Sequence, residues 1–175
     1  MPDGAKPSYE YFAFISYSRK DEKWAKWLQK ELEHYRLPSI LRKELASVPQ
    51  KIRPVFLDKT DLTTGQLTTA LHKELDSSKK LIVLCSPNSA RSEWVSKEAR
   101  RFIDSGRIGD IIPLIVEGVP NSGGEDECFP ESLRLPEEDQ LLGVSIPELG
   151  KNDAYLRVVA GILDIKFDYL KRRHE

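Results

Sequence analysis

The sequence contains few cysteines and no long apolar run. Its two cysteines are Cys85, in an apolar stretch, and Cys128, in a segment rich in turn-forming residues. Two isolated thiols at this separation favour neither a disulfide framework nor a metal site, so we expect both to be free. The longest apolar stretches span five or six residues, too few for a membrane span or the core of a signal peptide. The sequence therefore predicts a cytoplasmic protein without a membrane partner.

The chain also lacks an excess of charge of either sign. It carries 27 Lys and Arg against 28 Asp and Glu, so it has no strong positive field of the kind that binds phosphate backbones or anionic lipid. We expect no nucleic-acid partner. The length of 175 residues suits one domain with one core. The predicted organisation is a flexible N-terminal segment over residues 1–10 and one domain over residues 11–175.

Several familiar site motifs are absent. The sequence has no GxGxxG turn, no GxxxxGK[ST] loop, no GxSxG elbow and no HExxH helix, which argues against a dinucleotide fold, a P-loop, a serine hydrolase and a zinc protease. Its three histidines are scattered. We therefore expect no metal and no bound cofactor. A phosphoacceptor receiver is excluded too, because Ser16-Tyr17-Ser18 and Cys85-Ser86-Pro87 stand where that class needs acidic residues.

Apolar strand-like runs alternate with amphipathic helical patterns through most of the chain. Such alternation, with right-handed crossovers, predicts an α/β fold: a flavodoxin-like doubly wound parallel sheet. Pro54 favours an edge position for the second strand, which gives the order 2-1-3-4-5. Helices are expected after residue 20 and over about 67–75, 92–105 and 153–163, a loop over 86–91, and a mobile surface loop over 118–130. The predicted strands cover residues 11–15, 52–57, 81–85, 111–116 and 141–146.

In this strand order, ligands bind in the crevice between the carboxyl ends of strands one and three. Residues 16–20 and 86–91 are predicted to line it, with the start of the next helix beside them. On that helix Trp94 and Glu98 lie four residues apart and share a face. We expect Glu98 on the flank that borders the crevice. The alternative is that Glu98 is a solvated surface glutamate and Trp94 only a packing anchor.

Several motifs together resemble the Toll/interleukin-1 receptor (TIR) domain family, in particular its bacterial members. Residues 14–18, Phe-Ile-Ser-Tyr-Ser, are similar to the family's first box, and residues 58–65 resemble its D-x-x-x-L-x-x-G loop signature. Residues 84–89 with Trp94-Val95 resemble the region of the third strand and the following helix. The spacing Trp94-x-x-x-Glu98 is similar to that of the TIR enzymes that cleave NAD⁺.

The resemblance implies an NAD⁺ glycohydrolase or cyclase with Glu98 as the catalytic residue, NAD⁺ as substrate and, for bacterial members, a role in immune signalling against phage. It does not decide between hydrolysis and cyclisation. Two other functions stay open: a non-catalytic TIR interaction or adaptor module, and a nucleoside-processing transferase on a related fold. The residues predicted to bind substrate are Ser16, Tyr17, Ser18, Arg19, Arg91 and Trp94. For Tyr17 packing is the alternative, and for the two arginines solvation.

The resemblance also implies self-association with other TIR domains through the loop at residues 58–65. The residues predicted to form this contact are Asp58, Lys59, Asp61, Leu62 and Gly65. In similar enzymes this loop of one subunit completes the pocket of the next, a head-to-tail contact that extends into filaments. The basic ending at residues 171–175 follows directly on a helical pattern. We therefore expect the chain to be the N-terminal domain of a longer protein, although basic residues also suit the last turn of any helix.

Overall fold

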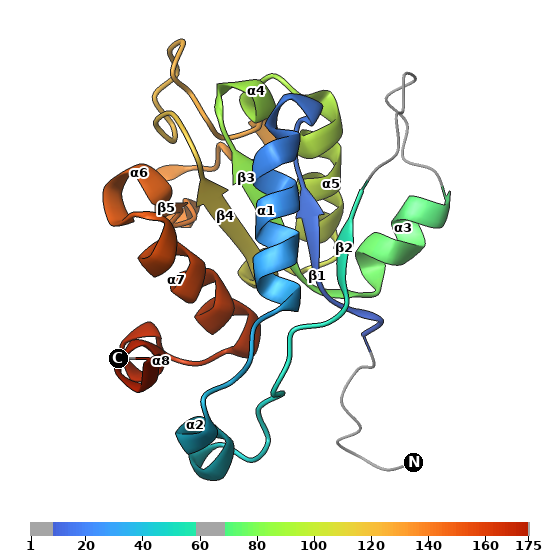
Figure 1. The fold of residues 1–175 in the computed structure, drawn as a ribbon. Coiled ribbons are helices and arrows are strands. Elements are labelled where there is room, and N and C mark those ends of the chain that lie inside the picture. The colour runs from blue at the N-terminus through green and yellow to red at the C-terminus, as the bar shows by residue number, and fades with distance from the viewer. Residues whose placement is uncertain (1–8, 59–68, 175) are drawn as a thin grey trace.

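The computed structural model describes residues 9–58 and 69–174 and contains one five-stranded parallel sheet (Figure 1). Its strand order is β2-β1-β3-β4-β5, so the predicted fold class and order are confirmed. Strand β2 is short and lies at an edge directly after Pro54, as expected from the missing amide proton of proline. The strands are β1 (Tyr11–Ser16), β2 (Val55–Leu57), β3 (Ser78–Cys85), β4 (Ile111–Ile115) and β5 (Val144–Ser145).

Helices cover both faces of the sheet (Figure 1). On one face, Ala13 and Ile15 of β1 pack in a cluster with residues of α1 (Glu22–Glu33) and α7 (Lys151–Leu163). On the other, Phe14 packs in a cluster with residues of α3 (Thr69–Asp76) and α5 (Glu93–Asp104). Successive side chains of a strand point to opposite faces, so an unbroken apolar run fills both cores. Strands β1 and β3 therefore lie side by side in the interior of the sheet, covered on both faces.

Shorter helices connect and extend these layers. Four are α-helical: α2 (Ser39–Glu44), α4 (Pro87–Ala90), α6 (Ile146–Leu149) and α8 (Phe167–His174). Four are 3-10 turns: η1 (Arg19–Asp21), η2 (Ile108–Asp110), η3 (Glu131–Leu133) and η4 (Glu137–Asp139). No helix in the described part of the chain is long and apolar enough to cross a membrane.

The predicted loop over residues 86–91 is wrong, because this segment contains α4. The hydroxyl of Ser86 accepts hydrogen bonds from the amides of Asn88 and Ser89, and the hydroxyl of Ser89 accepts one from the amide of Ser86. This reciprocal capping box satisfies the free amides of the first turn. Pro87 at the first helical position has a backbone angle already suited to a helix. Short polar residues such as those of residues 86–91 favour loops, but they favour helix caps as well.

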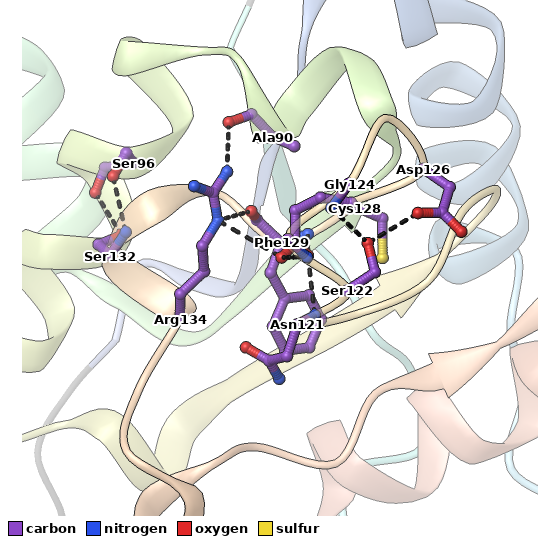
Figure 2. Close-up of polar contacts among 12 residues, drawn as sticks. Ala90, Ser96, Asn121, Ser122, Gly124, Asp126, Cys128, Phe129, Ser132 and Arg134 are labelled. Carbon is purple, nitrogen blue, oxygen red and sulfur yellow. Dashed lines mark hydrogen bonds and ion pairs between the residues drawn. The ribbon is translucent and has the colours of Figure 1, made fainter.

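The predicted mobile surface loop over residues 118–130 is wrong for its last four residues, 127–130, which are buried. The buried Glu127 carboxylate accepts hydrogen bonds from the amides of Asn121, Gly123 and Phe129. Arg134 donates to the carbonyls of Phe129 and Ala90, which joins the loop to α4 (Figure 2). The loop is therefore held by polar contacts that its composition of glycine, serine and acids does not reveal.

A buried lysine at the amino end of the sheet is paired with two carboxylates. Lys80 of β3 is 6% exposed, and its ammonium donates to Asp110 at 3.0 Å and Asp164 at 2.8 Å. Burial alone would lower the pKa of Lys80, but these two carboxylates outweigh it and raise the pKa. The buried charge of Lys80 is thus paired on both sides.

Candidate active site

The candidate site lies where β1 and β3 end. Parallel strands present their carboxyl ends at one edge of the sheet, so the residues that follow β1 and β3 meet there. Ser16 is the last residue of β1, and Ser86 follows directly on β3. Both are buried polar residues. Helix α5 begins beside them, with the Ser92 hydroxyl accepting a hydrogen bond from the amide of Val95 as its N-cap.

Glu98 projects from α5 into this edge of the sheet. It is 1% exposed and sits among the buried residues of the helix, so the alternative of a solvated surface glutamate is wrong. The Ser16 hydroxyl donates a hydrogen bond of 2.7 Å to Glu98 Oε1. Its second oxygen, Oε2, is buried without a hydrogen-bond partner among the described residues. The sequence prediction that Glu98 reaches the crevice is therefore consistent with its contact to Ser16.

Burial changes the protonation of Glu98. Desolvation raises its pKa well above the ordinary value, the hydrogen bond from Ser16 opposes the shift, and the negative charge of Asp58 adds to it. A buried carboxylate without a cation is disfavoured relative to the neutral acid. Enclosure therefore disfavours the charged form of the Glu98 carboxyl.

The two aromatic residues predicted to bind substrate both contact Asp58. The Tyr17 hydroxyl donates to the Asp58 carbonyl at 2.6 Å, and Trp94 Nε1 donates to the Asp58 carboxylate at 3.0 Å. Burial, together with the charge of Asp58, raises the pKa of Tyr17 to about 12, so its hydroxyl stays a donor. Asp58 itself is 7% exposed. Because Asp58 directly follows β2 and binds Trp94, it joins the end of this strand to α5, the helix that carries Glu98.

The other predicted binding residues lie at the rim. The Ser18 hydroxyl caps η1 by accepting from the amide of Lys20, and Arg19 of this turn is exposed. Arg91 is exposed at the end of α4. The structure thus gathers Ser16, Tyr17, Trp94 and Glu98, with Ser18, Arg19 and Arg91 on the flanking turns. Of the predicted self-association residues only Asp58 is described, since Lys59, Asp61, Leu62 and Gly65 lie outside the described residues.

Asp21 is a site residue that the sequence analysis missed. It is 6% exposed, and its carboxylate accepts hydrogen bonds from the Ser86 hydroxyl at 2.5 Å and the Asn88 amide at 3.0 Å. These bonds join the turn after β1 to the turn after β3, which are the two sides of the crevice. The signal in the sequence that could have found Asp21 is its place shortly after a central strand, on the side of the sheet edge that faces Ser86 and Asn88.

The residues that the structure describes do not suggest a metal site. Over residues 9–58 and 69–174, no group of three or more His, Cys, Asp and Glu side chains is arranged to hold one. Both cysteines are buried and free, and burial raises the pKa of each thiol. The functional groups of the candidate site are therefore one enclosed carboxyl, hydroxyl donors, two aromatic rings and arginines at the rim.

Two TIR domain structures are among the solved structures similar to this chain. Among solved structures, the TIR domains of the activated Roq1 resistosome, which directly recognises the pathogen effector XopQ, match with 19% identity and a TM-score of 0.43. That match covers 65% of this chain and 64% of the Roq1 chain, slightly less than two thirds. The TIR domain of the Toll-related receptor TRR-2 from Hydra magnipapillata matches with 14% identity and a TM-score of 0.45, over 94% of this chain and 99% of that one.

A comparison with curated proteins gives no match. The decisive finding is a family model. The model of the TIR domain matches residues 13–134, a range that begins within β1 and includes β2, β3, β4 and the helix that carries Glu98. Since this match extends over well more than half of the chain, the protein belongs to the TIR domain family.

Proposed function

We propose that this chain is a cytoplasmic NAD⁺ glycohydrolase or cyclase of bacterial immune signalling, and that Glu98 is its catalytic residue. The observation that carries the proposal is the enclosed Glu98 carboxyl, with Oε2 unpartnered among the described residues at the carboxyl edge of the sheet. A buried, unsatisfied polar atom destabilises a fold by about 1–3 kcal/mol. Such destabilisation is typical of functional sites, where a group is kept ready for a ligand.

The chemistry of NAD⁺ cleavage suits a single carboxyl. Nicotinamide departs with the electron pair of its bond to ribose C1, which turns a cationic ring into a neutral molecule. No acid is needed to protonate this leaving group, unlike the second carboxyl of most glycosidases. The positive charge passes to the ribosyl group, which a nearby carboxylate stabilises. Water then adds at C1 and releases a proton to give ADP-ribose; addition of an adenine nitrogen instead gives a cyclic product.

The enclosed acid must lose its proton to act in this way. A cationic nicotinamide beside Glu98 would favour the carboxylate, because an opposite charge within a few ångströms lowers the pKa of an acid. The Ser16 hydroxyl already donates to Oε1 at 2.7 Å and stabilises the charged form. The positive charge of the bound substrate would therefore stabilise the Glu98 carboxylate, which water does not solvate in the enclosed site. Ionisation is expected to follow occupation of the site.

The remaining predicted residues have roles in binding under this proposal. Tyr17 and Trp94 would contact the planar bases once substrate displaces their bonds to Asp58. Arg19 and Arg91, exposed on opposite turns, would contact the phosphates. No separate cofactor is required, because NAD⁺ is the substrate.

The alternative of a non-catalytic interaction module is less well supported. An adaptor surface needs exposed complementary groups and gains nothing from a carboxyl that is 1% exposed. Replacement by an apolar residue at position 98 would remove the unsatisfied oxygen and stabilise such a module. The presence of the buried glutamate is thus explained by catalysis and left unexplained by adaptor function.

The first prediction concerns turnover. Substitution Glu98→Gln keeps the shape of the side chain but removes its ability to carry a negative charge, so NAD⁺ cleavage should fall at least about 100-fold. Release of nicotinamide, followed by chromatography, measures it. The matched control is Glu93→Gln, an exposed glutamate on the same helix, which should keep wild-type activity. Near-normal turnover by Glu98→Gln would show that Glu98 is not catalytic.

The second prediction concerns pH-dependent turnover. Ser16→Ala removes the donor to Glu98 Oε1, which raises the pKa of Glu98 further. The acid limb of the pH–rate profile should move to higher pH, with about a tenfold loss of activity at neutral pH, the strength of one hydrogen bond to a charged group. The control Ser77→Ala removes a hydroxyl bonded to a backbone carbonyl before β3. An unshifted profile for Ser16→Ala would contradict this role of the contact.

The third prediction concerns stability. The pKa of Glu98 is raised in the folded state and is about 4.3 in an unfolded chain. Between these values the folded state binds more protons than the unfolded state, so the free energy of unfolding falls as pH rises. Glu98→Gln should therefore unfold at a higher temperature than wild type at neutral pH, and the difference should disappear below about pH 4. A lower unfolding temperature for Glu98→Gln at neutral pH is the contrary result.

The fourth prediction concerns self-association through the loop at residues 58–65. If one subunit completes the pocket of the next, only the associated fraction is competent. Activity per mole of protein should rise with protein concentration, and Leu62→Asp or Gly65→Pro should abolish this rise while the domain stays folded. Activity proportional to concentration from the most dilute samples upward, unchanged in both variants, would show that a single subunit suffices.

A further inference from the structure

Positive charge on this nearly neutral chain is concentrated in two segments. Residues 34–54, which connect α1 to β2 and include α2, carry five cations against one acid. Residues 165–174, which include α8, carry four cations against one acid. With histidine neutral, these segments together have a net charge of +7, whereas the whole chain has −1. The balanced total from which we expected no anionic partner therefore does not hold for this part of the molecule.

The two basic segments lie against each other. The carboxylate of Glu44, at the end of α2, accepts hydrogen bonds from the Tyr169 hydroxyl and from the Arg173 guanidinium, both on α8. These contacts engage Glu44, so Asp168 is the only acid in residues 34–54 and 165–174 without a side-chain partner. Figure 1 shows α2 at the opposite end of the molecule from α4. The positive charge is thus gathered away from the candidate active site.

Within the first segment, two cations lie opposite each other. Arg36 and Lys51 form an antiparallel backbone bridge, so their side chains are cross-strand neighbours. Both are exposed, and neither has a hydrogen-bond or ion-pair partner among the described residues. Arg53 is exposed two residues further on, with the fully buried Ile52 between, so Lys51 and Arg53 both point outward. Like charges at opposite positions are destabilising, and an anion between Arg36 and Lys51 would turn this repulsion into two favourable contacts.

Two further exposed cations lie where α2 meets α8. Lys43 and Arg172 directly precede Glu44 and Arg173, the ion pair that joins the two helices. Neither Lys43 nor Arg172 has a side-chain partner among the described residues. The region therefore offers five unpaired positive charges, which we call the basic surface: Arg36, Lys43, Lys51, Arg53 and Arg172.

Helix α2 adds an exposed apolar side chain to the basic surface. Ile40 is 50% exposed, whereas the adjacent Leu41 is fully buried and fixes the helix to the core. Ile40 and Lys43 are three residues apart, so they share the outer face of α2. This short helix thus presents an apolar side chain and a cation side by side.

We propose that the basic surface docks on an anionic phospholipid membrane. The negative surface potential of such a membrane attracts clusters of Lys and Arg. An apolar side chain beside the cations enters the boundary between the headgroups and the acyl chains. A lipid phosphate would lie between Arg36 and Lys51, and Ile40 would enter this boundary. The contact is peripheral, because only the outer face of α2 meets the lipid.

A nucleic acid matches the same region less well. Single strands bind through aromatic rings on which their bases stack. On α8, however, Arg157 lies over the ring of Phe167 at 4.1 Å and Arg173 lies over that of Tyr169 at 3.8 Å. A phosphate backbone also offers no apolar environment to Ile40. Lipid is therefore the favoured anion, because it accounts for both the charges and the exposed isoleucine.

Docking through the basic surface leaves the candidate active site free. Helix α4 borders the crevice and lies at the other end of the molecule from α2 (Figure 1). A chain held by the basic surface therefore presents the carboxyl edge of its sheet to the solution. The contact requires neither NAD⁺ cleavage nor self-association. A binding experiment without NAD⁺ thus tests it separately from the proposed activity.

Cosedimentation of the intact chain with vesicles measures this binding. At about 0.1 M salt, wild type should bind vesicles of equal parts phosphatidylglycerol and phosphatidylcholine but not vesicles of phosphatidylcholine alone, and about 1 M salt should weaken binding strongly. Each Lys or Arg near an anionic membrane strengthens binding about fivefold, so Arg36→Gln combined with Lys51→Gln should weaken it about 25-fold. The matched control combines Arg100→Gln with Lys73→Gln, exposed on α5 and α3, and should bind like wild type.

Two single substitutions separate binding from folding. Lys51→Glu places a carboxylate opposite Arg36, so the unfolding temperature should rise by about 2 °C. Vesicle binding by the same variant should fall at least about tenfold, because one positive charge becomes negative. Ile40→Ser keeps the charge unchanged and should weaken vesicle binding about fivefold, the effect of leaving half of an isoleucine side chain in water.

Three results would overturn the proposal. The first is a wild-type protein that does not bind the anionic vesicles at low salt. The second is vesicle binding that the combined Arg36→Gln and Lys51→Gln substitutions leave unchanged, which would assign the contact to another surface. The third is binding of duplex DNA or single-stranded RNA that this double variant weakens, together with vesicle binding that Ile40→Ser does not change. That outcome would assign the basic surface to nucleic acid.

Discussion

The contact between Ser16 and Glu98 joins the end of the central strand β1 to helix α5, and the candidate site depends on it. A carboxyl at this position is enclosed by apolar strands and by the side chains that follow them, so water cannot solvate its charge. Ser16 supplies one donor to Oε1. The second carboxyl oxygen, Oε2, has no partner among the described residues, and burial raises the pKa of the carboxyl well above its ordinary value. A cationic ligand would supply the interaction that this oxygen lacks.

Lys80 and Glu98, two buried ionisable residues at opposite ends of the sheet, differ in their partners. At the amino end Lys80 is paired with two carboxylates, which stabilises the charged form and fixes the ends of α7 and η2. At the carboxyl end, the groups that shift the pKa of Glu98 include no cation, and the negative charge of Asp58 raises this pKa further. Lys80 is thus paired, whereas Glu98, at the edge where parallel sheets bind ligands, keeps an oxygen without a partner among the described residues.

The sequence predicted the sheet order and the place of Glu98 because both follow from short-range patterns. Unbroken apolar runs indicate central strands, Pro54 indicates an edge, and helical spacing fixes the face of Glu98. Contacts made by polar residues far apart in sequence were not predictable in this way. Asp21 meets Ser86 across 65 residues, and Glu127 is buried in a segment whose composition is typical of an exposed loop. Hydrogen bonding, rather than hydrophobic periodicity, decides both.

The protonation of Glu98 in the empty protein is the central claim, and carbon-13 NMR of labelled glutamate carboxyls measures it most directly. The Glu98 resonance can be identified by its loss in Glu98→Gln and followed as pH is raised. The account predicts a midpoint well above the value of about 4.3 that is ordinary for glutamate, because burial disfavours the charge. A Glu98 carboxyl that ionises at or below that ordinary value would contradict the account.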